Sequence, residues 1–152
     1  MERPRHLPLP PFVFLGCLLA GIGLSRLLPL PFGLPRAVRV ALALAVALPA
    51  GALAGSAFRQ FLRARTTLDP KGTASALLVT GAFRFSRNPL YASLAAGLVW
   101  IGLLLGQAWV ALMAPVLVGI LSTWVIPREE ASLRAAFGEA YLEYQRRVRR
   151  WI

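Results

Sequence analysis

Four apolar segments occupy most of the chain and limit what it can fold into. They cover residues 7–25, 37–58, 89–106 and 108–126, and each has about the length that an α-helix needs to cross roughly 30 Å of hydrocarbon. Hydrophobic residues make up 57% of the sequence, above the roughly 45–50% that is usual for soluble globular proteins. We therefore predict an all-α, polytopic membrane protein that forms one membrane-embedded domain with about four transmembrane helices.

The first segment has an alternative interpretation as a cleaved signal peptide. No clear small-x-small cleavage site follows it, and Phe14-Leu15-Gly16 ahead of Cys17 is a poor lipoprotein signal with too little apolar sequence before it. We therefore interpret this segment as a membrane span. Cys17 is the only cysteine in the sequence, so it can form no disulfide within the chain.

Short polar stretches determine how the spans are connected. Residues 26–35 contain three prolines and a glycine and form the first connection, and residues 59–88 form a longer loop with a turn at 69–72. Pro49 is expected to kink the second span. Only the neighbourhood of Gly106 and Gln107 separates the last two spans, which predicts an antiparallel hairpin.

Residues 128–150 are predicted to form an amphipathic helix on the cytoplasmic face. Apolar residues recur in the tail at the three-to-four spacing of one helical face; they are Leu133, Phe137, Ala140, Tyr141, Tyr144, Val148 and Trp151. We expect this face to lie on the membrane surface or against the loop formed by residues 59–88.

The basic residues are distributed unevenly between the two sides of the membrane. If the four spans alternate, 14 of the 17 Lys and Arg residues share one side with both termini and the 59–88 loop, and only Arg26, Arg36 and Arg39 lie on the other. The positive-inside rule then places both termini in the cytoplasm, and we expect a prokaryotic inner membrane. Because the arginines cluster beside apolar runs, anionic lipid headgroups explain the net charge of +11 better than nucleic acid does.

The third span begins beside a basic, turn-rich segment. Asn88 is a strong helix N-cap and Pro89 suits the first helical position, so the amino end of this helix, together with Arg84 and Arg87, would form a site for a carboxylate or phosphate. The alternative is ordinary interfacial anchoring by the two arginines with an ordinary cap. Tyr91 has a similar alternative as an interfacial aromatic residue.

Two adjacent glutamates follow the fourth span, and their helical positions separate them. Glu130 has Arg134 four residues later, which predicts a surface ion pair. Glu129 shares its face with the apolar residues of the predicted helix, so its carboxylate should be buried. Burying a carboxylate costs desolvation free energy unless a cation or a hydrogen-bond donor binds it. The partner is either Arg84 or Arg87, or the ammonium or hydroxyl groups of a ligand.

The composition argues against several classes of protein. One His, one Cys and one Asp cannot build a histidine-rich metal site or a Cys-His pair with its carboxylate, and no GxGxxG follows a plausible strand. The spans show no buried charge at mid-membrane depth, which argues against a transporter. What remains is chemistry in which a cofactor brings its own reactivity and the protein supplies placement and electrostatics.

Two polar motifs together resemble a known enzyme family. The first is Leu-Val-Thr-Gly-Ala-Phe-Arg-Phe-Ser-Arg-Asn-Pro-Leu-Tyr at residues 78–91. The second follows a hydrophobic hairpin and is Glu-Glu-Ala-Ser-Leu-Arg-Ala-Ala-Phe-Gly-Glu-Ala-Tyr-Leu-Glu-Tyr-Gln-Arg-Arg-Val at residues 129–148. This half of the chain resembles the isoprenylcysteine carboxyl methyltransferase family and its phospholipid methyltransferase relatives. The first two spans carry no such signature.

The resemblance implies an integral membrane enzyme that uses S-adenosylmethionine (SAM), with S-adenosylhomocysteine (SAH) as the product. It implies a cytoplasmic pocket between the loop, the last two spans and the tail, with cofactor-binding residues at Leu78, Val79, Gly81, Phe83, Asn88, Pro89, Tyr91 and Glu129. It also implies positioning roles for Arg87, Asn88 and Arg128, and it assigns no catalytic acid or base and no metal. The sequence departs from the family pattern at Asn88, where many members have His, and its loop is one residue shorter than the commoner Leu-Val-Thr-x-Gly form.

The implied reaction is an in-line methyl transfer to a lipophilic acceptor. A sulfonium methyl is already electrophilic, so the protein mainly has to hold a nucleophile about 3–3.5 Å away. An isoprenylcysteine-like carboxylate, a lipid amine and other small lipophiles are all open as acceptors, because apolar pockets discriminate weakly. The expected partners are membrane lipids and this acceptor, without nucleic acid. The alternative from another class is a non-catalytic lipid-binding or assembly protein that keeps the family's shape.

Overall fold

The computed structural model describes residues 10–64 and 76–152 and confirms the all-α fold. Its elements in chain order are α1 (Pro10–Leu27), α2 (Arg36–Ala64), the 3-10 helix η1 (Gly81–Arg84), α3 (Pro89–Leu105), α4 (Ala108–Ile120), the π-helical turn η2 (Leu121–Val125) and α5 (Ile126–Arg147). Residues 1–9 and the predicted turn at 69–72 lie outside the described residues.

Most of these helices suit a membrane by length and composition. Within the described part of the chain, α1, α2 and the continuous helix from Ala108 to Arg147 are long and apolar enough to cross a bilayer, and α3 is an apolar helix of 17 residues. The chain is therefore a polytopic membrane protein. The second helix is longer than the predicted span of residues 37–58, since α2 extends to Ala64 at its carboxyl end. Pro49 lies inside this helix.

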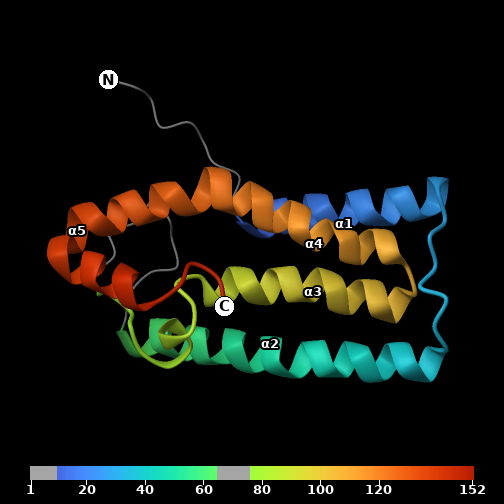
Figure 1. Cartoon of the computed structure of the whole chain (residues 1–152), viewed down its shortest axis with the longest axis horizontal. Coiled ribbons are helices and arrows are strands. Elements are labelled where there is room, and N and C mark those ends of the chain that lie inside the picture. The colour runs from blue at the N-terminus through green and yellow to red at the C-terminus, as the bar shows by residue number, and fades with distance from the viewer. Residues whose placement is uncertain (1–9, 65–75) are drawn as a thin grey trace.

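The apolar helices pack as neighbours in the order α2, α3, α4 and α1 (Figure 1). The main core lies between α1, α3 and α4, where Cys17, Leu98, Leu117 and Leu121 are buried together. The predicted antiparallel hairpin of α3 and α4 is present, and its turn is formed by Gly106 in the left-handed conformation. Arg39 connects α2 to the turn of this hairpin, because its guanidinium donates a hydrogen bond to the carbonyl of Leu103 at 3.1 Å.

Helices α3 and α4 are in close contact at Gly102. A Cβ atom added to Gly102 would lie 2.7 Å from the backbone nitrogen of Ala111, and a backbone atom cannot move away as a flexible side chain can. Small residues at helix contacts allow membrane helices to pack through dispersion forces in place of a hydrophobic driving force. The hairpin that carries the amino end of α3 and the start of α5 therefore depends on this contact.

We expect Gly102→Ala to destabilise the purified protein by about 1–3 kcal/mol, the usual cost of an added methyl group in a tight core. Thermal unfolding in detergent, followed by circular dichroism, measures the effect as a lower midpoint. Gly97→Ala is the matched control on the same helix, because its added Cβ would meet Phe14 at an ordinary 3.6 Å. Equal midpoints for the two variants would show that the α3–α4 contact is looser than the structure indicates.

The tail differs from the sequence prediction of a helix that begins separately after the fourth span. α4 passes through the wider turn η2 directly into α5 without a break. Inside α5, Gly138 has the non-helical angles φ 52° and ψ −126°, and there the chain reverses so that its last turns lead back toward the start of α3 (Figure 1). The second half of α5 is therefore positioned against the loop.

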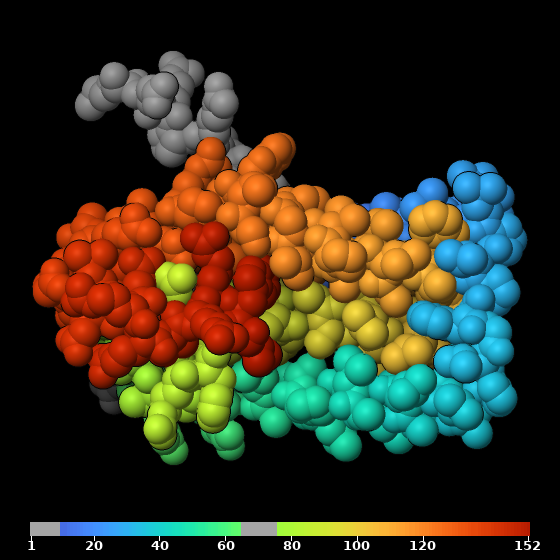
Figure 2. All heavy atoms as spheres, in the orientation of Figure 1, coloured from blue at the N-terminus to red at the C-terminus, as the bar shows by residue number. Residues whose placement is uncertain are grey.

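The tail packs on the loop with its apolar face, as one of the two predicted arrangements requires. Tyr141 and Tyr144 are buried with Phe83 and Ala82 of the loop and Ala57 of α2. In the space-filling view the tail and the loop lie directly against each other at one end of the molecule (Figure 2). Of the seven predicted apolar positions in the tail, only Ala140 is exposed.

Candidate functional site

The described part of the loop after α2, residues 76–88, is held in place by polar side chains of α2. The hydroxyl of Ser56 accepts a hydrogen bond from the amide of Ala82 at 3.1 Å, and Thr80 donates to Gln60 at 3.0 Å. Gly81 lies between them with φ +59°. These contacts hold η1 against the end of α2, so the position of the loop residues that lead to α3 is fixed by α2.

Two of the predicted cofactor residues in this loop, Leu78 and Phe83, also serve as packing residues. Phe83 is buried and meets Phe61 edge-on with ring centroids 5.8 Å apart, and its carbonyl accepts a hydrogen bond from the hydroxyl of Tyr144 at 2.7 Å. Leu78 packs against the same cluster, whereas Val79 is exposed. The tail therefore closes over the loop through Tyr144.

The predicted start and N-cap position of the third helix are correct, but the side chain of Asn88 binds elsewhere. Pro89 occupies the first turn of α3, and Asn88 stands at the N-cap position. Within the described structure the Asn88 side chain makes no capping hydrogen bond; its amide group instead donates to the carbonyl of Arg150 at 3.0 Å. A tail carbonyl thus approaches the point where the sequence predicts a site for an anion, because the tail folds back over it.

Arg87 and Glu130 form a buried ion pair that the sequence prediction missed. Arg87 Nη1 lies 2.9 Å from Glu130 Oε1, and Glu130 is only 4% exposed. Arg150 also binds this carboxylate through two nitrogens at 3.1 and 2.7 Å. The predicted pair with Arg134 exists at 3.6 Å, but the prediction of a surface pair was wrong because the loop and the returning tail cover Glu130.

Glu129 and Tyr91 form the second polar contact of the site. The hydroxyl of Tyr91 on α3 donates to Glu129 Oε1 at 2.5 Å, and both side chains are half-buried. Burial raises the pKa of Glu129, and the hydrogen bond from Tyr91 acts in the opposite direction. Among the described residues neither Arg84 nor Arg87 forms an ion pair with Glu129, so its partner in this structure is a neutral hydroxyl.

The predicted site residues thus divide into two groups. Tyr91 and Glu129 meet directly, and Arg87 and Asn88 lie beside them in contact with Glu130 and the tail. Of the others, Leu78, Gly81 and Phe83 pack toward α2 and Pro89 begins α3. Val79, Arg84 and Arg128 are exposed.

Three further residues belong to this region and were missed from the sequence, namely Ser86, Ser122 and Arg150. Trp151 was predicted only as part of the apolar face of the tail, and its hydrogen bond to Ser122 was not predicted. Ser86 is fully buried, accepts from the amide of Asn88 at 3.0 Å and donates to Arg150. A serine two residues before an Asn-Pro helix start is a local signal for such a turn. Arg150 gave no signal, because its contacts depend on the reversal at Gly138.

The fold and the polar contacts define a helical membrane protein with a buried polar site where the loop, α3 and α5 meet. The sequence pattern of the phospholipid methyltransferase family matches residues 38–140, a range that contains the loop residues, Tyr91 and both glutamates. The chain belongs to this family, and membership indicates a membrane methyltransferase. No curated protein and no solved structure shows significant similarity to the chain.

Proposed function

We propose that the protein transfers a methyl group from SAM to a lipophilic acceptor at the cytoplasmic face of the membrane. Family membership supports the methyl transfer. The observation that carries the proposal is the contact between Glu129 and Tyr91, which places a carboxylate at the junction of the polar tail and the apolar core.

The side chains at this contact fit the chemistry of SAM. A half-buried carboxylate costs desolvation free energy when neither a cation nor enough hydrogen-bond donors bind it. Among the described residues, Glu129 accepts a side-chain hydrogen bond only from the hydroxyl of Tyr91. The ammonium or the ribose hydroxyls of SAM would supply the missing donors. Hydrogen bonds to a charged group contribute about 1.5–3 kcal/mol each, which is enough to make Glu129 a main determinant of binding.

The residues have distinct parts in this proposal. Bound SAM supplies an electrophilic methyl group. Glu129 accepts hydrogen bonds from the cofactor, and Tyr91 fixes the orientation of that carboxylate. The backbone at Leu78 and Val79 contacts the adenine side, and the exposed Arg128 is a contact for cofactor or acceptor.

The acceptor side of the proposal rests on the apolar helices. α1 and α2 expose large apolar side chains, among them Phe12, Leu19 and Leu48, so these helices can face the lipid from which the acceptor enters in this proposal. We propose an isoprenylcysteine-like carboxylate, a lipid amine or another small lipophile. Placing and orienting such a group against the methyl is the main task of the protein.

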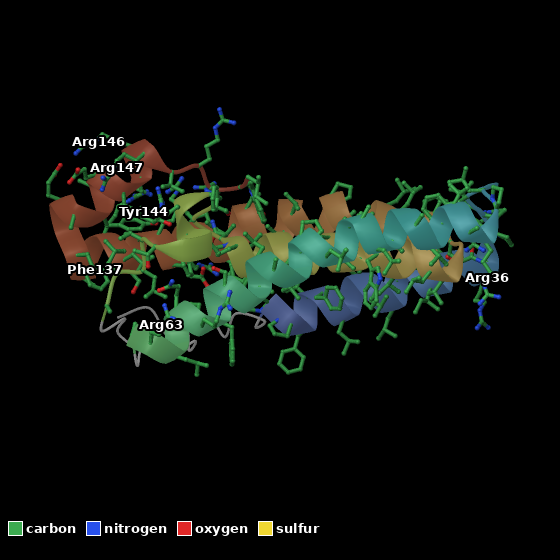
Figure 3. All side chains as sticks on the ribbon, turned by 90° about the horizontal axis from the view of Figure 1, so that it is seen from below. Arg36, Arg63, Phe137, Tyr144, Arg146 and Arg147 are labelled. Atoms are coloured by element: carbon green, nitrogen blue, oxygen red, sulfur yellow. The ribbon has the colours of Figure 1, made fainter. Side chains whose placement is uncertain are left out.

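We further propose that the chain crosses the membrane four times, at residues 7–25, 37–58, 89–106 and 108–126, with both termini in the cytoplasm. The positions of charged residues support this orientation. Arg63, Arg146 and Arg147 lie at one end of the molecule and Arg36 lies at the other (Figure 3). The end with the larger number of arginines is then the cytoplasmic one.

Binding of SAH to the purified protein tests the proposed function. Isothermal titration calorimetry in detergent is expected to show saturable binding with a Kd on the order of micromolar, about −8 kcal/mol. Membranes that contain the protein, incubated with radiolabelled SAM, are then expected to label a lipid-extractable or volatile fraction. Absence of SAH binding by folded protein would reject the proposal in favour of a non-catalytic lipid-binding or assembly role.

A further inference from the structure

The segment that follows α5, residues 148–152, lies across the loop and is called the strap below. Its backbone carbonyls accept three hydrogen bonds from the loop. The amide of Arg87 donates to Arg149 at 2.9 Å, and Ser86 and Asn88 donate to Arg150 at 3.2 and 3.0 Å. The strap is therefore bound to the residues that lead directly into α3.

The other end of the strap reaches the turn between α4 and α5. The indole nitrogen of Trp151 donates to the hydroxyl of Ser122 in η2 at 3.1 Å. Trp151 packs against the same apolar cluster as Tyr91. The strap thus passes from the start of α3 to η2.

Glu130 joins the strap to the loop. Its buried carboxylate binds Arg150 of the strap through two nitrogens and Arg87 of the loop through one. Removing one partner of a buried ion pair costs more than the pair itself contributes, because the other charges are left without compensation. Hydrogen bonding to Glu130 also raises the pKa of Arg150. Neither the loop nor the strap can shift without disturbing this carboxylate.

We propose that Glu130 is a positioning residue and that the strap forms one wall of the cofactor site. Glu130 acts through Arg87 and Arg150: it holds the loop and the strap at a fixed distance from α5, where the neighbouring Glu129 meets Tyr91. A wall that is already in place reduces the ordering that a ligand must otherwise bring about on binding. This inference rests on the proposed function, since the ligand it concerns is SAM.

The test compares Glu130→Gln with the matched control Glu143→Gln, which affects an exposed pair with Arg147 on the same helix. Glu130→Gln is expected to weaken SAH binding at least tenfold by calorimetry and to speed hydrogen exchange in residues 86–91 and 148–152. Exchange in α2 and in the membrane part of α3 should stay unchanged. Glu143→Gln is expected to change neither quantity.

Further outcomes separate this inference from the proposed function. If the wild type binds no SAH, the proposed function fails, and the inference fails with it even where the strap is released. If the wild type binds SAH and Glu130→Gln binds it within twofold, only the inference is overturned. Faster exchange throughout all helices would also overturn it, because Glu130 would then support the whole fold. Arg150→Lys keeps the charge but not the two-nitrogen contact, so its Kd for SAH is expected to lie between those of the wild type and Glu130→Gln. If Glu130→Gln does not fold, Arg150→Lys replaces it in the test, and a wild-type Kd for SAH in this variant would overturn the inference.

Discussion

Glu129→Ala is expected to weaken SAH binding by roughly 10- to 150-fold while leaving the helical content of the protein unchanged. The range corresponds to the loss of hydrogen bonds to a charged group, about 1.5–3 kcal/mol. The fold should persist because Glu129 forms no ion pair with a described residue, and its removal leaves only the hydroxyl of Tyr91 without a partner. Calorimetry with SAH measures the Kd, and circular dichroism checks the fold.

Two companion variants make this result specific. Tyr91→Phe removes the hydroxyl but keeps the carboxylate, so it should weaken SAH binding less than Glu129→Ala does. Glu139→Ala is the control for lost negative charge, since Glu139 is exposed and pairs only with Arg146 among the described residues. Glu129→Ala with wild-type affinity for SAH would return Glu129 to a structural role and remove the central residue of the proposed site.

The parts of the fold that local sequence determines were predictable. The apolar lengths predicted the membrane helices, and Asn88-Pro89 predicted where α3 starts, because proline fits the first helical turn whatever the surroundings. The partner of the Asn88 side chain was not predictable. Asn88 had two partners available, its own helix and the carbonyl of Arg150, and the second lies 62 residues away in sequence. Distant contacts of this kind leave no local pattern.

The two glutamates show the same limit within one helix. The sequence predicts burial for Glu129, which shares a helical face with apolar residues, and a surface ion pair for Glu130, which has Arg134 four residues later. The structure covers both: Glu129 faces Tyr91, while Glu130 faces Arg87 and the returning strap. The strap can cover Glu130 only because the chain reverses its direction at Gly138.

The uninterrupted passage from α4 to α5 also has a physical reason. Apolar sequence ends near Ile126 and therefore predicts the end of a span there, but a helix can continue after it leaves the bilayer. Pro127 has no amide hydrogen and its ring crowds the preceding turn. The wider turn η2 directly before it gives the ring room, and such π-turns occur often at functional sites. Here η2 also presents Ser122 to Trp151.

Gly138→Ala is expected to release the end of the tail from the loop. Gly138 has φ 52° and ψ −126°, a region that residues with a Cβ rarely adopt, and forcing alanine into it costs about 1–3 kcal/mol. Apart from the backbone of α5 around it, no atom of a described residue lies within 4 Å of the added Cβ, so the cost comes from the backbone alone. Hydrogen exchange in residues 139–152 should become about 5- to 150-fold faster, the same free energy expressed as an equilibrium.

The comparison with Gly119→Ala decides whether this effect belongs to the reversal of the chain. Gly119 lies in α4 and also has nothing within 4 Å of an added Cβ, but it is an ordinary helical residue, where alanine is favoured by about 1 kcal/mol. That variant should leave the exchange of the tail unchanged. If Gly138→Ala also left the tail protected, α5 would continue straight, and Tyr144 and Arg150 could not reach the loop. If the tail were released but SAH bound as before, the strap would be no wall of the cofactor site, and Glu129 with Tyr91 would hold the ligand alone.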